Sequence, residues 1–297
     1  MTAVRVAILG TAHPHLADHR NAIRRDPRAA LAAVFEPAAS DLDDVLTRAD
    51  VVIIDSTTAD HPRLLRAAIG AGKPVLVEKP LAATVEATDA LMSVIDGAAA
   101  PVTTAMFLRC APALRELRTL LAEDRFGAVT SVHARFSHPG LLDGWFRGQA
   151  SWMLDPRQSG VGGFADLGIH LLDLLLWLRP GAELRVVAAS QDRAAGVALL
   201  DWGGVPVTLH SGWRSRPGGL HVHVDGAHGS CTVSGGRLEI STGTGRQVES
   251  YPPPDAAAVV SAWLDRLQGI AAWEPPTTAD IVRCARLLHT IDAVAGG

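Results

Sequence analysis

Two stretches of the sequence hold side chains that could move a proton or stabilise a developing negative charge. The first is VEKPL at 77–81, where Lys79 follows a short apolar segment. An ammonium at the carboxyl end of a parallel strand can polarise a substrate oxygen, because ligands of open α/β sheets bind at that edge. A surface lysine paired with Glu78 would produce the same pattern, so VEKPL by itself leaves both interpretations open.

The second stretch is ADLGIHLLD at 165–173. Asp166 and His170 are four residues apart and share one face of a helix, and Asp173 lies three residues beyond His170. Polar groups in so apolar a helix are costly to bury unless they are partnered or used. A histidine with carboxylates on its own face suits the role of proton acceptor. A hydrogen-bonded core histidine and a metal site made of the three residues are the alternatives.

A third stretch, ILGTAHPHLADHR at 8–20, has the position set of a dinucleotide-binding turn. Gly10, Ala12 and His15 occupy the glycine positions of G-x-G-x-x-G, so two glycines are replaced, but N–H groups at a helix start still bind phosphate. Glu36 follows about 20 residues on, where a carboxylate accepts bonds from the adenosine ribose hydroxyls. No arginine follows Glu36, which predicts NAD rather than NADP; an ordinary exposed strand-end acid is the alternative.

His13 and His15 in this turn could also bind a metal ion. Metal-dependent hydrolases of the TIM-barrel class begin with such an H-x-H pair, but they need eight strand–helix units. Because the alternation stops here after about five strands, the sequence predicts no metal site and favours a cofactor contact or a plain helix start for this pair.

The elements that would position these residues alternate between apolar strands and amphipathic helices before residue 111. Such alternation with short connections indicates a doubly wound parallel sheet of the Rossmann type. Only 14 residues separate Glu36 from Val51, which leaves room for one helix and predicts that an edge strand is missing. The predicted strands are 4–10, 31–36, 51–58, 74–80 and 101–107, and the predicted helices are 15–25, 41–49, 61–72 and 84–98.

The pattern changes after Ala111. A helix at 112–127 precedes a region rich in glycine and tryptophan, an apolar helix at 164–178, polar-turn strands from Glu183 to about Tyr251, and helices at 255–270 and 278–295. The strands predict an open antiparallel sheet. We therefore expect an α/β chain with a dinucleotide-binding domain at 1–111 and an α+β domain for substrate and oligomerisation at 112–297.

Composition narrows the classes of partner. A net charge of −4 leaves no basic footprint for nucleic acid. The longest apolar run, 171–178, is too short to span a bilayer, and the first residues lack the apolar core of a signal peptide. Three scattered cysteines fit a reducing compartment. We expect a cytoplasmic protein that binds neither nucleic acid nor membrane.

Two longer segments resemble the Gfo/Idh/MocA oxidoreductases, named for glucose–fructose oxidoreductase and inositol dehydrogenase. HPRLLRAAIGAGKPVLVEKPLAAT at 61–84 is similar to the family segment that ends in E-K-P, and SWMLDPRQSGVGGFADLGIHLLD at 151–173 is similar to its D-x-G-x-H-x-x-D block. The resemblance covers nearly the whole chain. It implies a Rossmann domain followed by an α/β domain with a large open antiparallel sheet.

The resemblance also implies the site. His170 would take a hydroxyl proton, Lys79 would hold the same oxygen, Asp166 would orient the substrate or the histidine, and the Lys79–Pro80 peptide would be cis. The residues implied for the cofactor are Gly10, Thr11, Ala12, His13, His15, Glu36, Ser56, Thr57, Thr58, His61, Glu78 and Lys79. Weaker candidates for the substrate cleft are Arg109, Trp152, Asp173 and Trp213, for which core packing is at least as good an explanation.

The predicted function is hydride transfer between NAD, with NADP less favoured, and a carbinol carbon of a sugar, polyol or related hydroxy compound. A catalytically silent dinucleotide or sugar sensor of the same fold is the first alternative. A metal-dependent hydrolase using His13 and His15 is the second. The open sheet predicts a homodimer or homotetramer formed through the C-terminal sheet, because a large exposed sheet face is normally covered.

Overall fold

The computed structural model describes residues 3–270 and 273–296. The chain divides into two compact units, each assembled from separate stretches of sequence. The first comprises Met1–Phe107, Phe146–Gly160 and Ala256–Val282, and the second comprises Leu108–Trp145, Val161–Asp255 and Arg283–Gly297. The assignment of cofactor binding to 1–111 and of substrate binding to 112–297 stays a prediction.

The first unit is built on a parallel sheet of five strands in the order β2-β1-β3-β4-β5. The four residues of β3 are all buried, so an uninterrupted apolar run suits its place inside the sheet. The connection between β2 and β3 holds only the short helix α2, and the predicted loss of an edge strand is confirmed among the described residues. The strands are β1 (Val4–Leu9), β2 (Ala29–Phe35), β3 (Val51–Ile54), β4 (Val75–Val77) and β5 (Val102–Thr104).

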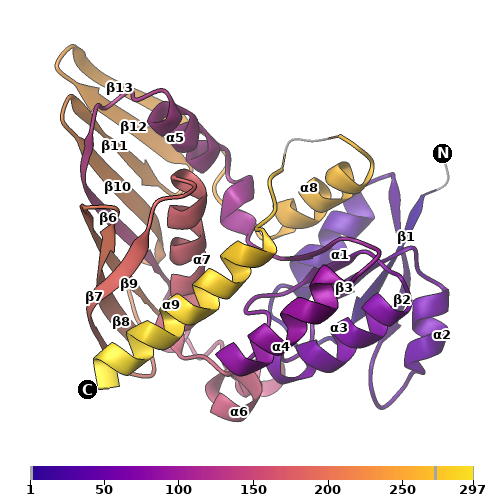
Figure 1. Cartoon of the computed structure of the whole chain (residues 1–297). Coiled ribbons are helices and arrows are strands. Elements are labelled where there is room, and N and C mark those ends of the chain that lie inside the picture. The colour runs from indigo at the N-terminus through magenta and orange to yellow at the C-terminus, as the bar shows by residue number, and fades with distance from the viewer. Residues whose placement is uncertain (1–2, 271–272, 297) are drawn as a thin grey trace. The chain divides into compact units, whose positions relative to one another are not determined.

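Helices cover both faces of this sheet, as the predicted doubly wound fold requires (Figure 1). One face packs against α2, α3 and α4 through a core of apolar side chains that includes Leu9, Ile54 and Leu65. The helix α1 packs instead against α8 (Ala257–Leu267). The crossover helices are α1 (Leu16–Arg25), α2 (Leu42–Thr47), α3 (His61–Gly70) and α4 (Val85–Asp96), and the stretch 146–160 adds η3 (Gly148–Leu154) and α6 (Pro156–Ser159).

Local capping explains where these helices begin. The side chain of Asp41 accepts a hydrogen bond from the backbone N–H of Asp44 at the start of α2, and Thr84 does the same for Ala87 at the start of α4. Pro62 occupies the first turn of α3, where the missing N–H is tolerated. Local sequence signals therefore determine where α2, α3 and α4 begin.

The second unit contains an eight-stranded sheet in the order β13-β12-β11-β10-β6-β9-β8-β7. The pair β6 and β9 is parallel and the other pairs are antiparallel, so the predicted open antiparallel sheet is confirmed in its main part. The strands are β6 (Val129–Ser137), β7 (Leu184–Gln191), β8 (Ala195–Trp202), β9 (Val205–Gly212), β10 (Gly219–Gly226), β11 (Gly229–Ser234), β12 (Arg237–Thr242) and β13 (Gly245–Ser250).

Helix α7 (Gly163–Leu178) lies against this sheet with all sixteen residues buried. A side chain at Gly163 would place its Cβ 2.1 Å from the carbonyl oxygen of Ala194, and one at Gly168 would meet the Ser211 hydroxyl at 3.0 Å. The two glycines therefore let the helix approach β8 and β9 closely. Helix α5 (Pro112–Ala122) packs on β11 and β12, and α9 (Thr278–Gly296) ends the chain.

Residues Pro156–Leu178 form a stretch long and apolar enough to cross a membrane by length and composition alone. Most of this stretch is buried inside the protein, and the core helix of a soluble protein passes the same test.

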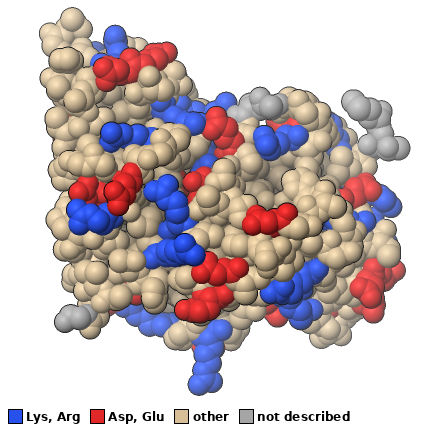
Figure 2. Space-filling model, in the orientation of Figure 1, with Lys and Arg blue, Asp and Glu red and all other residues tan. Residues whose placement is uncertain are grey.

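On the face shown in Figure 2, acidic and basic side chains are intermixed rather than gathered by sign.

Candidate active site

The carboxyl ends of β1, β3 and β4 meet at one edge of the parallel sheet, and the predicted dinucleotide turn lies there. Gly10 ends β1 with a φ of +87°, a conformation that favours glycine. A Cβ at this position would lie 2.6 Å from the Cα of Ser56, which follows β3. Position 10 therefore requires glycine, because the chain turns tightly there beside the neighbouring strand.

Residues 11 and 12 of the turn are held by side chains of η3. The indole Nε1 of Trp152 donates to the carbonyl oxygen of Ala12 at 3.0 Å, and the side-chain amide of Gln149 donates to the carbonyl oxygen of Thr11. Within residues 3–270 and 273–296, the backbone N–H groups of Thr11 and Ala12 form no hydrogen bond. The turn thus offers two N–H groups beside a helix N-terminus, which fits the phosphates of a dinucleotide.

Glu36 follows β2 and is exposed. Its backbone bonds to Ser40, while its carboxylate has no hydrogen-bond or ion-pair partner among the described residues. The carboxylate is therefore available to ribose hydroxyls, as the sequence predicts. Together with the turn at Gly10, this feature makes the residues present compatible with a nicotinamide dinucleotide.

Residues after β3 and β4 form the inner part of this edge. Ser56 and Thr58 are buried, and Thr57 lies between them at the start of a short helical turn, η1 (Thr58–Asp60). His61 is buried and its Nδ1 lies 3.0 Å from the carbonyl oxygen of Pro80. Burial lowers the pKa of His61, so a neutral imidazole holds the backbone next to Lys79. His61 is a positioning residue in this arrangement.

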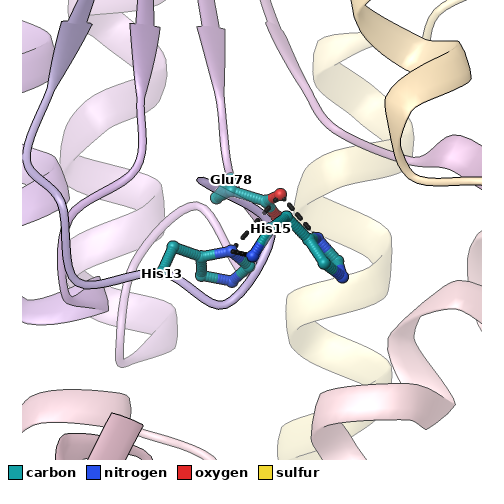
Figure 3. A group of neighbouring side chains, drawn as sticks. All are labelled: His13, His15 and Glu78. Atoms are coloured by element: carbon teal, nitrogen blue, oxygen red, sulfur yellow. Dashed lines mark hydrogen bonds and ion pairs between the residues drawn. The ribbon is translucent and has the colours of Figure 1, made fainter. Parts of the chain in front are cut away.

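Glu78 is the centre of a histidine cluster beneath the turn (Figure 3). Its Oε1 atom lies 2.8 Å from Nδ1 of His15 and 3.5 Å from Nδ1 of His13. Burial lowers the pKa of His13 well below its usual value, which favours a neutral ring. Burial alone would raise the pKa of Glu78, but the surrounding histidines hold it well below its usual range, and the group stays a carboxylate.

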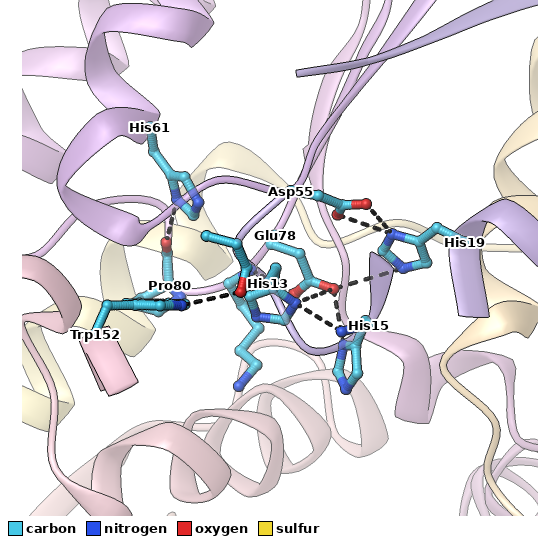
Figure 4. A network of polar contacts seen from close by, with 10 residues as sticks. His13, His15, His19, Asp55, His61, Glu78, Pro80 and Trp152 are labelled. Carbon is cyan, nitrogen blue, oxygen red and sulfur yellow. Dashed lines mark hydrogen bonds and ion pairs between the residues drawn. The ribbon is translucent and has the colours of Figure 1, made fainter. Parts of the chain in front are cut away.

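His19 and Asp55 extend this cluster (Figure 4). Nδ1 of His19 lies 2.9 Å from Oδ1 of Asp55, and its Nε2 lies 3.5 Å from Oε1 of Glu78. Burial lowers the pKa of His19, but the carboxylate of Asp55 outweighs it and raises the pKa to about 9. Both side chains are fully buried, so the pair joins α1 to the end of β3.

Lys79 is also buried, with 4% of its surface exposed, at the end of β4. Its backbone N–H donates to Oε2 of Glu78 at 3.0 Å, which fixes the glutamate against the same strand. The Lys79–Pro80 peptide is cis, and this prediction from the family resemblance is confirmed.

In the second unit, the helix α7 carries Asp166 and His170 on one buried face. Oδ2 of Asp166 accepts a hydrogen bond of 2.8 Å from the indole Nε1 of Trp213. The ring of His170 packs edge to face with Phe136 on β6, with 5.8 Å between ring centroids. The carboxylate of Asp166 therefore has a fixed orientation one helical turn from the imidazole.

Arg109 and Asp173 form a buried bidentate ion pair. Nη2 of Arg109 lies 2.6 Å from Oδ1 of Asp173, and Nε donates to Oδ2 at 2.8 Å. Both side chains are at most 3% exposed. This pairing explains why a charged residue is tolerated in so apolar a helix, and it favours a packing role for both residues over contact with a substrate.

The structure groups the predicted residues by unit. Lys79 and the predicted cofactor residues belong to the first unit, as does Trp152, whereas Asp166, His170, Asp173, Arg109 and Trp213 belong to the second. Sequence reasoning missed Gln149, His19 and Asp55. The pattern H-x-H-x3-H at 13–19 was a visible signal for His19, since a residue four positions into a helix lies on the same face as its start.

Comparison with known proteins identifies relatives for both halves. The family model described as "Oxidoreductase family, NAD-binding Rossmann fold" matches residues 4–105, and "GFO/IDH/MocA C-terminal domain" matches residues 114–232. A 1,5-anhydro-D-fructose reductase of Ensifer adhaerens is 30% identical over 190 residues, which is 61% of this chain and 56% of the relative. An NADP-dependent D-xylose 1-dehydrogenase of Haloarcula marismortui is 28% identical over 62% of this chain and 53% of the relative.

This chain thus matches only a little over half the length of these curated relatives. Among solved structures, an inositol dehydrogenase homolog complexed with NAD+ from Azotobacter vinelandii superposes with a TM-score of 0.86. It is 19% identical, with 100% of this chain and 96% of that chain covered. The superposition shows that the two proteins share a fold.

Proposed function

Because the chain belongs to the Gfo/Idh/MocA oxidoreductase family, we propose that it is a nicotinamide-dependent dehydrogenase of a sugar, polyol or related hydroxy compound. The observation that carries the proposal is the buried face of α7, where Trp213 fixes the carboxylate of Asp166 one turn from His170. A buried carboxylate and imidazole on one face of so apolar a helix favour a proton-transfer role over an ordinary core contact. The reductase and dehydrogenase relatives support the same reaction class.

The residues at the edge of the parallel sheet bind the cofactor in this proposal. The N–H groups of Thr11 and Ala12 and the N-terminus of α1 hold the phosphates, and Glu36 accepts hydrogen bonds from the adenosine ribose. The backbone around Ser56–Thr58 forms the inner wall of the cofactor site, and His61 lies behind it. His13, His15 and Glu78 complete this wall beneath the turn. When bound, the nicotinamide supplies the acceptor or donor of the hydride.

The protein's own groups handle the proton and the developing charge. His170 of the second unit accepts the proton of the substrate hydroxyl, and the ammonium of Lys79 in the first unit stabilises negative charge that develops on the substrate. Asp166, held by Trp213, orients His170 or the substrate hydroxyl. The contacts already made by Trp213, Arg109 and Asp173 favour positioning roles for these three residues, and Trp152 positions the turn through Ala12.

NAD is the preferred cofactor in this proposal. The exposed Glu36 carboxylate would repel a 2′-phosphate, and the two residues that follow it are Pro37 and Ala38 rather than arginines. The xylose dehydrogenase relative shows that the family also includes an NADP-dependent member. The preference therefore rests on Glu36 and on the lack of an arginine at the next two positions.

Titration with NADH and NADPH, followed by a screen of sugars and polyols, tests the proposal. Tryptophan quenching should saturate with NADH and respond more weakly to NADPH. Turnover of a hit should be lost in Lys79→Met and His170→Ala while NADH binding persists. Binding without turnover of any polyol would indicate a silent sensor, and binding of neither dinucleotide would refute the proposal.

We also propose that the protein is a cytoplasmic homo-oligomer that meets its copy through the second sheet. Along β8 and β9 the side chains alternate between buried and exposed, which leaves Val197 49% and Leu199 38% exposed beside Thr208 and His210. A sheet face that exposes large apolar residues side by side is normally covered. A second copy would cover it with the same face under two-fold symmetry.

A further inference from the structure

We propose that His13, His15 and Glu78 bind a divalent transition-metal ion of the zinc class beneath the dinucleotide turn. Each of the three offers one ligand atom, and these atoms all lie within 4.8 Å of one another. The three residues also belong to the wall of the cofactor site in the proposed function, but the metal ion takes no part in the proposed proton transfer. It would tie the loop after β1 to the end of β4.

The distances suit one ion. Ligand atoms about 2.0–2.2 Å from a tetrahedral zinc lie roughly 3.3–3.6 Å apart. Oε1 of Glu78 lies 3.5 Å from Nδ1 of His13 and 2.8 Å from Nδ1 of His15. A small outward movement of the His15 ring brings the second distance into range, and this ring is the exposed member, with 26% of its side chain accessible.

The orientation of His13 is fixed by its neighbour. The backbone N–H of His15 donates to Nδ1 of His13 at 3.2 Å, so this nitrogen carries no proton, and a metal ion would take over the one lone pair that accepts this hydrogen bond. The same nitrogen faces Glu78 in Figure 3. A neutral ring nitrogen aimed at a buried carboxylate is the form that a metal ion requires.

Two further groups contact the carboxylate of Glu78. His19 is paired through Nδ1 with Asp55, and its buried Nε2 faces Oε1 of Glu78 at 3.5 Å with no hydrogen-bond partner among the described residues. Oε2 of Glu78 is held by the backbone N–H of Lys79. Outer partners of this kind orient the ligands of metal sites.

The donor set defines the class of ion. Two imidazoles and one carboxylate match the ligands of zinc sites that keep one position open, and they are poor ligands for calcium or magnesium, which prefer oxygen atoms alone. A dication with one carboxylate ligand adds a net positive charge below the turn. That charge would stand in for the two glycines that the phosphate-binding fingerprint has lost.

Metal content is the first test, made on the full-length protein without cofactor or substrate. After equilibration with Zn²⁺ and removal of free ions, the wild type should retain about one zinc per chain. Co²⁺ in place of Zn²⁺ should give visible absorption bands of a four- or five-coordinate site. His15→Ala, whose ring is partly exposed, should weaken binding by about 100-fold or more.

Matched variants separate the site from general histidine binding. His133→Ala removes an exposed histidine of β6 and should leave zinc content unchanged. Glu78→Gln should abolish retention, and circular dichroism establishes that each variant is folded. Zinc absent from the wild type, or retained equally by His15→Ala and His133→Ala, would overturn the proposal. A protein that binds NADH but no zinc would leave the dehydrogenase proposal standing.

Discussion

The indole Nε1 of Trp213 donates a 2.8 Å hydrogen bond to Oδ2 of Asp166, and both side chains are buried. The two residues are 47 positions apart in the sequence, one on α7 and the other just after β9. A buried carboxylate needs such donors, because an unsatisfied charge in a protein interior is costly. This bond explains why a tryptophan rather than another large apolar residue occupies position 213.

Trp213→Phe should keep an aromatic ring but remove the N–H donor together with part of the buried ring system, so the loss due to the hydrogen bond is the excess over the matched control. We expect an excess loss of about 1.5–3 kcal/mol in the free energy of unfolding, the usual range for a hydrogen bond to a charged group. Urea unfolding followed by circular dichroism measures it. Trp202→Phe is the matched control, since the indole nitrogen of Trp202 is also buried but lacks a hydrogen-bond partner in the part of the chain that the structure describes. Equal losses in the two variants would contradict the assigned role.

The buried ion pair of Arg109 and Asp173 gives a second prediction, which concerns the free energy of unfolding. Arg109→Met should lower the free energy of unfolding by about 3–5 kcal/mol, because Asp173 would remain buried and uncompensated. The double variant Arg109→Met/Asp173→Leu should regain most of that loss, since apolar residues of similar volume replace both charges. If the double variant is less stable than Arg109→Met, the pair acts in some way other than mutual compensation.

The parallel sheet could be predicted from sequence because its signals are local. Apolar runs such as 51–54, closed by polar or glycine residues, identify strands, and a 14-residue gap excludes a further strand. One strand of the second sheet, β6, lies outside the range of 183–251 in which strands were predicted. β6 pairs with β9 and β10, more than 60 residues away, so no hairpin turn adjoins it.

Single residues of the candidate site were predictable, but their partners were not. His13, His15 and Glu78 each stood out by type and position. That Glu78 contacts both histidines depends on β1 and β4 ending at the same edge with β3 between them. Trp213 and Asp166 show the same limit, because only the packing of α7 on β9 brings them together.

Glu36 gives a prediction about cofactor choice. Glu36→Ala should reduce the preference for NADH over NADPH by about 10-fold or more, because the hydrogen bonds to the ribose and the repulsion of a 2′-phosphate disappear together. Fluorescence titration of both dinucleotides measures the ratio. Asp43→Ala is the control, since Asp43 is also an exposed acid of the first unit. A ratio unchanged in Glu36→Ala would place the ribose elsewhere.

Asp26 gives a prediction about acid stability. Arg28 donates to both carboxylate oxygens of Asp26 and also pairs with Asp265 of α8 at 2.7 Å. The side-chain hydrogen bonds from Arg28 lower the pKa of Asp26 below its usual value of 3.8. Because the folded pKa lies below the unfolded one, the stabilisation is present above the unfolded pKa and is lost as pH falls through the folded value.

Asp26→Asn should therefore be less stable than the wild type at pH 7, and the difference should shrink as the pH falls below about 4. Urea unfolding at a series of pH values tests this. Asp43→Asn serves as the comparison because the same substitution there removes an exposed acid. A difference between Asp26→Asn and wild type that stays constant down to pH 2 would rule out the ion pair as its source.

The exposed face of the second sheet gives a prediction about assembly. Val197 and Leu199 project from β8 on the side of the sheet that includes the exposed Thr208 of β9. Val197→Asp/Leu199→Asp should convert a dimer or tetramer into a smaller species, since two like charges per copy would meet at a two-fold interface. Light scattering coupled to size exclusion measures the mass. Ile270→Asp is the control, because Ile270 is 52% exposed but belongs to the first unit. A wild type that is monomeric at all concentrations, or a variant of unchanged mass, would mean that the sheet face serves another purpose.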